Sequence, residues 1–222
     1  GTDLRISHVV VNTMLASVTG ALATMFFLMG TGKKPDPSMM VNGMLAGLVA
    51  ITAPCAFVNS IGACIIGAVA GVVVVLSVYF WDKAGVDDPV GAISVHGVCG
   101  LWGVLSVGIF ATGQYGAGWN GAHLFKLADG TMKYFNNMAD APKDAIEKGV
   151  AGLLYGDVGQ LAAQAIDCVV VFVFGFIMAM VWFKISNLIT PIRVTKEVEL
   201  AGLDMPEMGA MGWPDFEHTG QP

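Results

Sequence analysis

The sequence has 222 residues, of which 55% are hydrophobic and only 13% charged, and its formal net charge is −6. A soluble domain usually carries about 25% charged residues, so the composition excludes an ordinary soluble globular protein. The negative charge lies largely in loops and in the C-terminal segment, and it indicates no nucleic-acid partner.

Long uncharged stretches predict an all-α membrane protein with five transmembrane helices, since about 20 apolar residues cross a bilayer. The first span ends at a Gly-Lys-Lys turn, and Asp36 is the predicted N-cap of the second, with Pro37 at its first helical position. The uncharged stretch 37–81 would form a helix about 67 Å long, so the chain must reverse near Pro54 and the Asn59–Ser60 pair. The predicted spans are 6–29, 38–57, 61–81, 89–112 and 159–189.

The fourth span is predicted to begin with Asp88 as its N-cap and Pro89 at its first helical position. The segment 113–158 is polar and glycine-rich, and its pattern favours a short amphipathic helix around 142–155. After the fifth span, residues 191–222 form a polar tail, so that residues 1–190 make up the membrane domain.

Basic residues predict the orientation, because short cytoplasmic loops are enriched in Lys and Arg. They are concentrated in two short loops and at the start of the tail: Lys33, Lys34, Lys83, Lys184, Arg193 and Lys196. We therefore expect a multi-pass protein of the cell membrane, surrounded by lipid. Its tail 191–222 is expected to be cytoplasmic and its loop 113–158 extracytoplasmic.

The stretch "SVHGVCGLWG", residues 94–103, places one histidine inside an uncharged, glycine-rich segment. At 100° per residue, Ala92, His96, Gly100 and Gly103 share one helical face, which leaves a narrow groove beside the imidazole. Such a histidine either forms a hydrogen bond to a neighbouring helix or has a functional role. Ionisable residues within transmembrane segments commonly have such a role. A neutral imidazole offers one donor and one acceptor, which suits a small polar solute.

The four cysteines lie in apolar segments without a CxxC pair, and we interpret them as packing residues. No set of His or Cys residues has the spacing of a metal site. The sequence therefore predicts neither a metal nor a cofactor.

The segment "DDPVGAISVHGVCGLWGVLSVGIFA" resembles the penultimate helix of the ammonium transporter (Amt/Mep/Rh) family, in particular its Amt branch. The resemblance continues through "VNTMLAS", "NGMLAGLVAITAPCAFV", "GACIIGAVAGVVVV" and the tail "RVTKEVELAGLDMPEMGAMGWPD". It implies a fold of eleven helices, ten of them in two inverted five-helix repeats, assembled as a homotrimer with one pore per subunit. This chain corresponds to helices seven to eleven.

The resemblance also implies the site residues. His96 matches the second of two pore histidines, and Leu45, Thr52 and Ala92 match positions lining the lower pore. The first pore histidine, the outer recognition site and the phenylalanine gate would all precede Gly1. His8 matches no pore histidine, and we interpret it as an interfacial or packing residue.

In this family the tail packs against the cytoplasmic face, couples subunits and can bind a PII-type regulatory protein. The corresponding residues here are Arg193, Lys196, Gly202 and Asp204. Met208 stands where some members have His, and Trp213 where many have Tyr, which leaves PII control open.

The resemblance implies a non-enzymatic function, the passage of ammonium or ammonia through a hydrophobic pore for nitrogen uptake. Ammonium would lose its proton near the histidine before it crosses. The alternative is an ammonium sensor with the same membrane fold and little flux. Such a sensor is expected to continue past the tail into a kinase or cyclase domain, so transport is the preferred hypothesis.

Overall fold

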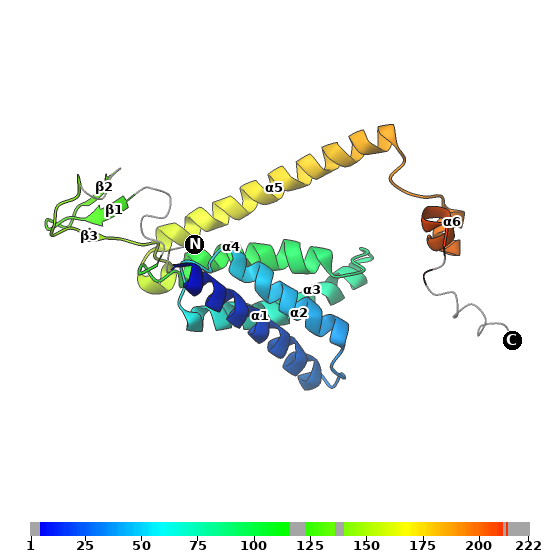
Figure 1. Cartoon of the computed structure of the whole chain (residues 1–222), viewed down its shortest axis with the longest axis horizontal. Coiled ribbons are helices and arrows are strands. Elements are labelled where there is room, and N and C mark those ends of the chain that lie inside the picture. Colours follow the sequence, from blue (N-terminus) through cyan, green and yellow to red (C-terminus); the bar gives the residue numbers. More distant parts are fainter. Residues whose placement is uncertain (1–4, 116–122, 136–139, 211, 213–222) are drawn as a thin grey trace. The chain divides into compact units, whose positions relative to one another are not determined.

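The computed structural model describes residues 5–115, 123–135, 140–210 and 212. It divides into two compact units, residues 1–170 and 171–222. Helices dominate the first unit (Figure 1). They are α1 (Arg5–Gly30), α2 (Pro37–Thr52), α3 (Ser60–Ala84), the π-helix η1 (Ile93–Val98), α4 (Cys99–Phe110) and the start of α5 (Val158–Ile189).

Four helical segments of the described residues are long and apolar enough to cross a membrane: Arg5–Gly30, Ser60–Ala84, Ile93–Phe110 and Val158–Ile189. The remaining predicted span contains α2, which has 16 residues. At 1.5 Å per residue its length of about 24 Å falls short of the hydrocarbon core, about 30 Å thick.

The helix predicted to reach residue 57 ends at Thr52 instead. Pro54 explains the early end, because proline has no N–H to continue the helical hydrogen bonds, although Ala53 before it keeps helical backbone angles. Residues 53–59, the α2–α3 segment, are non-helical and mostly buried or half-buried. α3 then starts at Ser60, with the Asn59 side chain accepting a 2.8 Å hydrogen bond from the Gly62 N–H.

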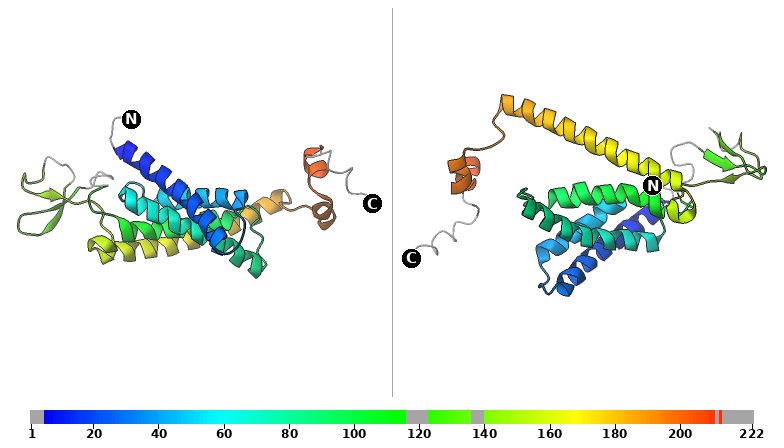
Figure 2. Two further views of the ribbon diagram at one scale, coloured as in Figure 1. Left: turned by 90° about the horizontal axis from the view of Figure 1, so that it is seen from below. Right: turned by 180° about the vertical axis from the view of Figure 1, so that it is seen from behind.

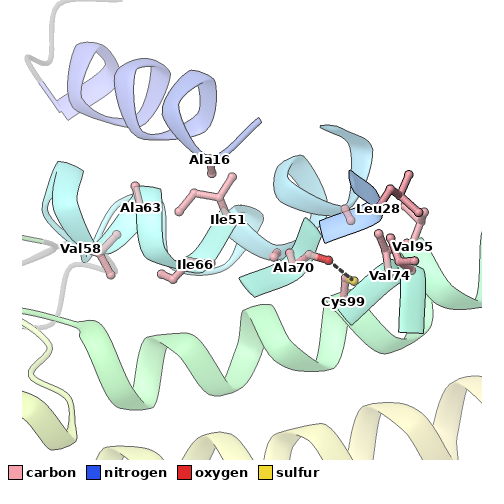
Figure 3. Packing of buried hydrophobic residues seen from close by; sticks show 13 residues of the cluster. Ala16, Leu28, Ile51, Val58, Ala63, Ile66, Ala70, Val74, Val95 and Cys99 are labelled. Atoms are coloured by element: carbon pink, nitrogen blue, oxygen red, sulfur yellow. Dashed lines mark hydrogen bonds between the residues drawn. The ribbon is translucent and has the colours of Figure 1, made fainter. Parts of the chain in front are cut away.

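Helices α1 to α4 pack alongside one another, as two further views show (Figure 2). Small residues permit the close approach, because a Cβ at Gly67 or Gly71 would overlap the backbone of α1. The Thr24 hydroxyl donates to the Gly71 carbonyl at 2.6 Å, and the Trp102 indole to the Ile66 carbonyl at 3.1 Å. Small and branched side chains fill the core between these helices, with Cys99 placed against Ala70 (Figure 3).

The loop contains a small sheet. Strands β1 (His123–Lys126), β2 (Met132–Phe135) and β3 (Ile146–Glu147) are antiparallel in the order β2-β1-β3. The predicted amphipathic helix around 142–155 is therefore wrong: β3 and a single 3₁₀ turn, η3 (Leu153–Tyr155), occupy that region. Pairing with β1, a partner distant in sequence, overrides the local helical pattern.

Helix α5 has no buried residue along its length. After it, the second unit contains α6 (Lys196–Ala201) and a π-helical turn, η4 (Asp204–Met208). The protein is thus mostly helical, as the sequence predicts.

Candidate functional site

Four residues singled out from the sequence, Leu45, Thr52, Ala92 and His96, are all exposed. We call them the α2–η1 face. Leu45 and Thr52 lie seven residues apart, two turns along the same side of α2. The opposite side of α2, with Gly43, Ala46, Gly47 and Ala50, is buried.

Helix α2 contacts both η1 and α4, so the two parts of this face lie on neighbouring helices. A Cβ on Gly100 would contact the Val49 side chain at 3.8 Å, and one on Gly103 would meet the Ala50 carbonyl oxygen at 2.5 Å. Val49 lies between Leu45 and Thr52 along α2, and Gly100 lies one turn after His96. The contact between α2 and α4 thus begins about one turn beyond His96.

The imidazole of His96 is uncovered and makes no hydrogen bond to any residue that the structure describes. The ring that the sequence places inside an uncharged segment is thus exposed in this chain. Both ring nitrogens are available to a group outside the described residues, one as a donor and one as an acceptor when the ring is neutral.

A π-helix changes which residues share the histidine's face. Residues 93–98 form π-helical turns, whereas the shared face predicted from the sequence requires 100° per residue throughout. As a result, Gly103 is buried against α2, and Gly100 is half-buried beside Val49. The prediction that both glycines share the exposed face of Ala92 and His96 is wrong, because the wider turn shifts the phase of the following helix. π-Helical turns are frequent at functional sites.

Asp88 fixes the start of η1, although helical structure begins only at Ala92 and not at Pro89. Asp88 is 7% exposed, and its carboxylate accepts hydrogen bonds from the Ile93 N–H at 2.9 Å, the Ser94 N–H at 3.2 Å and the Ser94 hydroxyl at 3.0 Å. The residue thus satisfies the free N–H groups of the first turn through its side chain. His96 lies in the turn that this carboxylate anchors.

We expect Asp88→Asn to destabilise the assembled protein by about 1–3 kcal/mol, because a buried amide cannot accept all three hydrogen bonds. Thermal unfolding of the purified full-length protein measures this loss. Asp87→Asn is the matched control, since it removes the same charge from an exposed neighbour. Equal stability of the two variants would contradict the anchoring role of Asp88.

Asp36 lies at the N-cap of α2, where its carboxylate accepts a 3.1 Å hydrogen bond from the Ser38 N–H and Pro37 follows at the first helical position. No three His, Cys, Asp or Glu residues within the described part of the chain are placed to hold one metal ion.

The four tail residues, Arg193, Lys196, Gly202 and Asp204, are all exposed. Arg193 forms an ion pair with Glu199, in which its Nη2 donates to both carboxylate oxygens, at 2.9 and 3.1 Å. Lys196 is the first residue of α6. Gly202 ends this helix with φ +100° and ψ 150°, and Asp204 accepts a 2.8 Å hydrogen bond from the Gly212 N–H. Met208 is exposed at the end of η4, whereas Trp213 lies outside the described residues.

Asn12 and Tyr115, for which the sequence predicts no site, join His8 around the α2–α3 segment. The sequence signal for this cluster is an asparagine within an apolar stretch. Asn12 is buried in the structure, and a buried amide requires hydrogen-bond partners.

Known proteins resemble this chain over most of its length. Residues 2–213 match the model of the Ammonium Transporter Family. The ammonium transporter Amt2 of Archaeoglobus fulgidus is 37% identical over 98% of this chain, and the ammonium transporter of Bacillus subtilis is 31% identical over 92% of it. The chain spans 41% and 44% of the lengths of these two relatives.

Solved structures show the same arrangement of helices. One described as a sensor Amt protein is 28% identical, with a TM-score of 0.70 over 93% of this chain and 43% of that one. Mep2 of Candida albicans is 24% identical, with a TM-score of 0.68 over 89% of this chain and 38% of its own. The second likeness concerns the fold alone.

Proposed function

Because this chain belongs to the ammonium transporter family, we propose that it forms one side of a membrane pore that conducts ammonium or ammonia for nitrogen uptake. The observation that carries the proposal is the α2–η1 face, on which His96 lies uncovered beside apolar and small residues. In the resemblance to the family, His96, Thr52, Leu45 and Ala92 are the residues of this chain that line the pore. The protein is a multi-pass membrane protein, since several apolar helices accompany the family match.

The chemistry of the solute explains why an imidazole suits this position. Ammonium and potassium carry the same charge and have similar sizes, so charge alone separates them poorly. Ammonium differs in its N–H donors and its removable proton. A dry passage opposes any bare cation, whereas a neutral imidazole accepts a hydrogen bond from ammonia and donates one to it. In the proposed mechanism, ammonium therefore loses a proton before the resulting ammonia crosses the passage.

Uptake by the full-length protein in lipid vesicles tests the function directly. An ammonium gradient should produce a saturable pH change inside the vesicles, well above that of vesicles without protein. An equal gradient of potassium should produce none. No ammonium-driven change above the empty vesicles would contradict transport.

An ammonium sensor is the second candidate, favoured by the likeness to a structure described as a sensor Amt protein. A sensor binds ammonium but conducts little of it. Ammonium-dependent thermal stabilisation without measurable uptake in the same preparation would favour this function over transport.

We propose further that residues 1–190 are the membrane domain, the loop 113–158 is extracytoplasmic and the tail 191–222 is cytoplasmic. The lysines of the short loops, Lys33, Lys34 and Lys83, support this orientation. The family resemblance supports a homotrimer and contact of the tail with a PII-type protein. Arg193, Lys196, Gly202 and Asp204 would carry the regulatory role.

Gly202 gives a testable prediction about the tail. Its backbone angles, φ +100° and ψ 150°, belong to a region occupied almost only by glycine. We therefore expect Gly202→Asp, and almost equally Gly202→Ala, to lower transport while the oligomer stays intact. Strain from the new Cβ, and not only the charge, causes the loss.

Coexpression with the wild type measures coupling between subunits. The Gly202→Asp subunit should depress uptake per wild-type subunit at matched surface levels. Gly209→Asn is the control, because φ +67° at Gly209 is a left-handed conformation that asparagine tolerates. Full activity per wild-type subunit would exclude coupling through the tail.

A further inference from the structure

The α2–α3 segment, residues 53–59, receives several hydrogen bonds from side chains of α1. The Asn12 amide nitrogen donates to the carbonyl oxygens of Cys55 and Val58, both at 2.9 Å. The Asn12 oxygen accepts a 3.3 Å hydrogen bond from the Ser60 hydroxyl. Asn12 itself is fully buried. Non-helical backbone at membrane depth needs such internal partners, because lipid supplies none.

These bonds determine the role of His8. Its Nε2 lies 2.8 Å from the Val58 carbonyl oxygen and 3.0 Å from the Asn12 amide nitrogen. The Asn12 amide has two hydrogens, and we assign them to the carbonyls of Cys55 and Val58, which leaves none to donate to His8. Nε2 therefore carries a hydrogen and donates it to Val58, an assignment that follows from the hydrogen-bond network.

His8 also joins the segment to the chain that follows α4. Its ring stacks on Tyr115, with the ring centroids 4.1 Å apart and the planes 21° from parallel. In the same stretch the Thr112 N–H donates to the Phe57 carbonyl at 3.0 Å. One histidine thus contacts both non-helical segments at this end of the bundle.

The α2–α3 segment is coupled in turn to the end of α2. The Cys55 N–H donates to the Ile51 carbonyl at 2.8 Å, and the Cys55 thiol donates to the Thr52 carbonyl at 3.4 Å. Thr52 is the last residue of α2, and its hydroxyl bonds within the helix to Leu48 at 2.8 Å. The position of Thr52 therefore depends on where the following segment is held.

We propose that His8 and Asn12 are positioning residues for ammonium conduction. They hold the α2–α3 segment, and through Cys55 they hold Thr52 at the edge of the α2–η1 face. His8 lies outside that face and acts through backbone carbonyls. This inference rests on the proposed function, because the role of Thr52 in conduction belongs to it.

Two variants of His8 separate its hydrogen bond from its stacking. His8→Gln keeps an amide donor that can reach Val58 but loses the ring. His8→Phe keeps a ring that can stack on Tyr115 but has no donor. Ser60→Ala is a milder variant, which removes only the donor to the Asn12 oxygen and avoids loss of folding.

The experiment compares initial rates of ammonium and methylammonium uptake by the full-length protein in vesicles, per assembled protein. His8→Phe should lower ammonium uptake about fivefold and change the ratio of the two rates, because the pore wall at Thr52 shifts. His8→Gln should restore both values towards those of the wild type. Ser60→Ala should lie between His8→Phe and the wild type.

Labelling of Cys55 by a water-soluble maleimide, located by mass spectrometry, follows the segment without reference to transport. His8→Phe should raise the labelling rate and His8→Gln should not. If His8→Phe keeps wild-type uptake, rate ratio and labelling, the inference is overturned. The same holds if His8→Gln behaves like His8→Phe, or if only the amount of assembled protein changes.

The two proposals fail separately. A wild-type protein that takes up no ammonium contradicts the proposed function and, with it, a positioning role in conduction. A wild-type protein that transports while its His8→Phe variant keeps both rates contradicts only the inference.

Discussion

Replacement of His96 by alanine in the full-length protein should lower ammonium flux about tenfold or more. The reason is that loss of a hydrogen bond to a desolvated solute raises its free energy by about 1–3 kcal/mol. The ring is uncovered on the α2–η1 face and has no partner among the described residues. Its removal should therefore affect the solute rather than the fold. Assembly and thermal stability are expected to stay close to those of the wild type.

Uptake of ammonium and potassium into vesicles checks this result at matched amounts of assembled protein. Potassium should be measured because a wider, wetter passage could admit it once the ring is gone. Ile93→Ala is a useful control, since it also truncates an exposed side chain of η1 but removes no polar group. Normal ammonium flux together with unchanged exclusion of potassium would leave His96 without a conducting role.

A Cβ at Gly103 should destabilise the protein far more than one at Gly100, although the two glycines lie three residues apart in the same helix. The added atom at Gly103 would stand 2.5 Å from the Ala50 carbonyl oxygen, which no real Cβ contact tolerates. Helices α2 and α4 must separate to make room. Overpacking of this kind costs about 1–3 kcal/mol and occasionally more.

Gly100→Ala is the matched control. Its Cβ would meet only the Val49 side chain, at an ordinary 3.8 Å, and alanine favours a helix over glycine by about 1 kcal/mol. Thermal unfolding of the assembled protein in detergent should therefore show a clear loss for Gly103→Ala and no loss for Gly100→Ala. Equal stability of the two variants would contradict the close contact between α2 and α4.

Much of the membrane topology followed from local sequence properties. The absence of charge from 6–32 and 89–125 predicted helices close to those observed, because burying a charge in lipid is so costly that composition alone marks the spans. The Asp36–Pro37 pair predicted the start of α2, since an N-cap acts within a single turn. The family resemblance supplied His96, Thr52, Leu45 and Ala92 as site residues, and the structure places all four on exposed positions.

Other features depend on contacts between residues distant in sequence, and only the tertiary structure decided them. The π-helix at 93–98, with Asp88 bonded to its first turn, placed Gly103 against α2 and left His96 uncovered. Helical periodicity could not predict this, because it assumes one constant angle per residue. Likewise, the hydrogen bond of His8 joins it to the Val58 carbonyl, 50 residues away in the sequence, in the non-helical segment that contains Pro54. A side chain's own sequence neighbourhood carries no record of such partners.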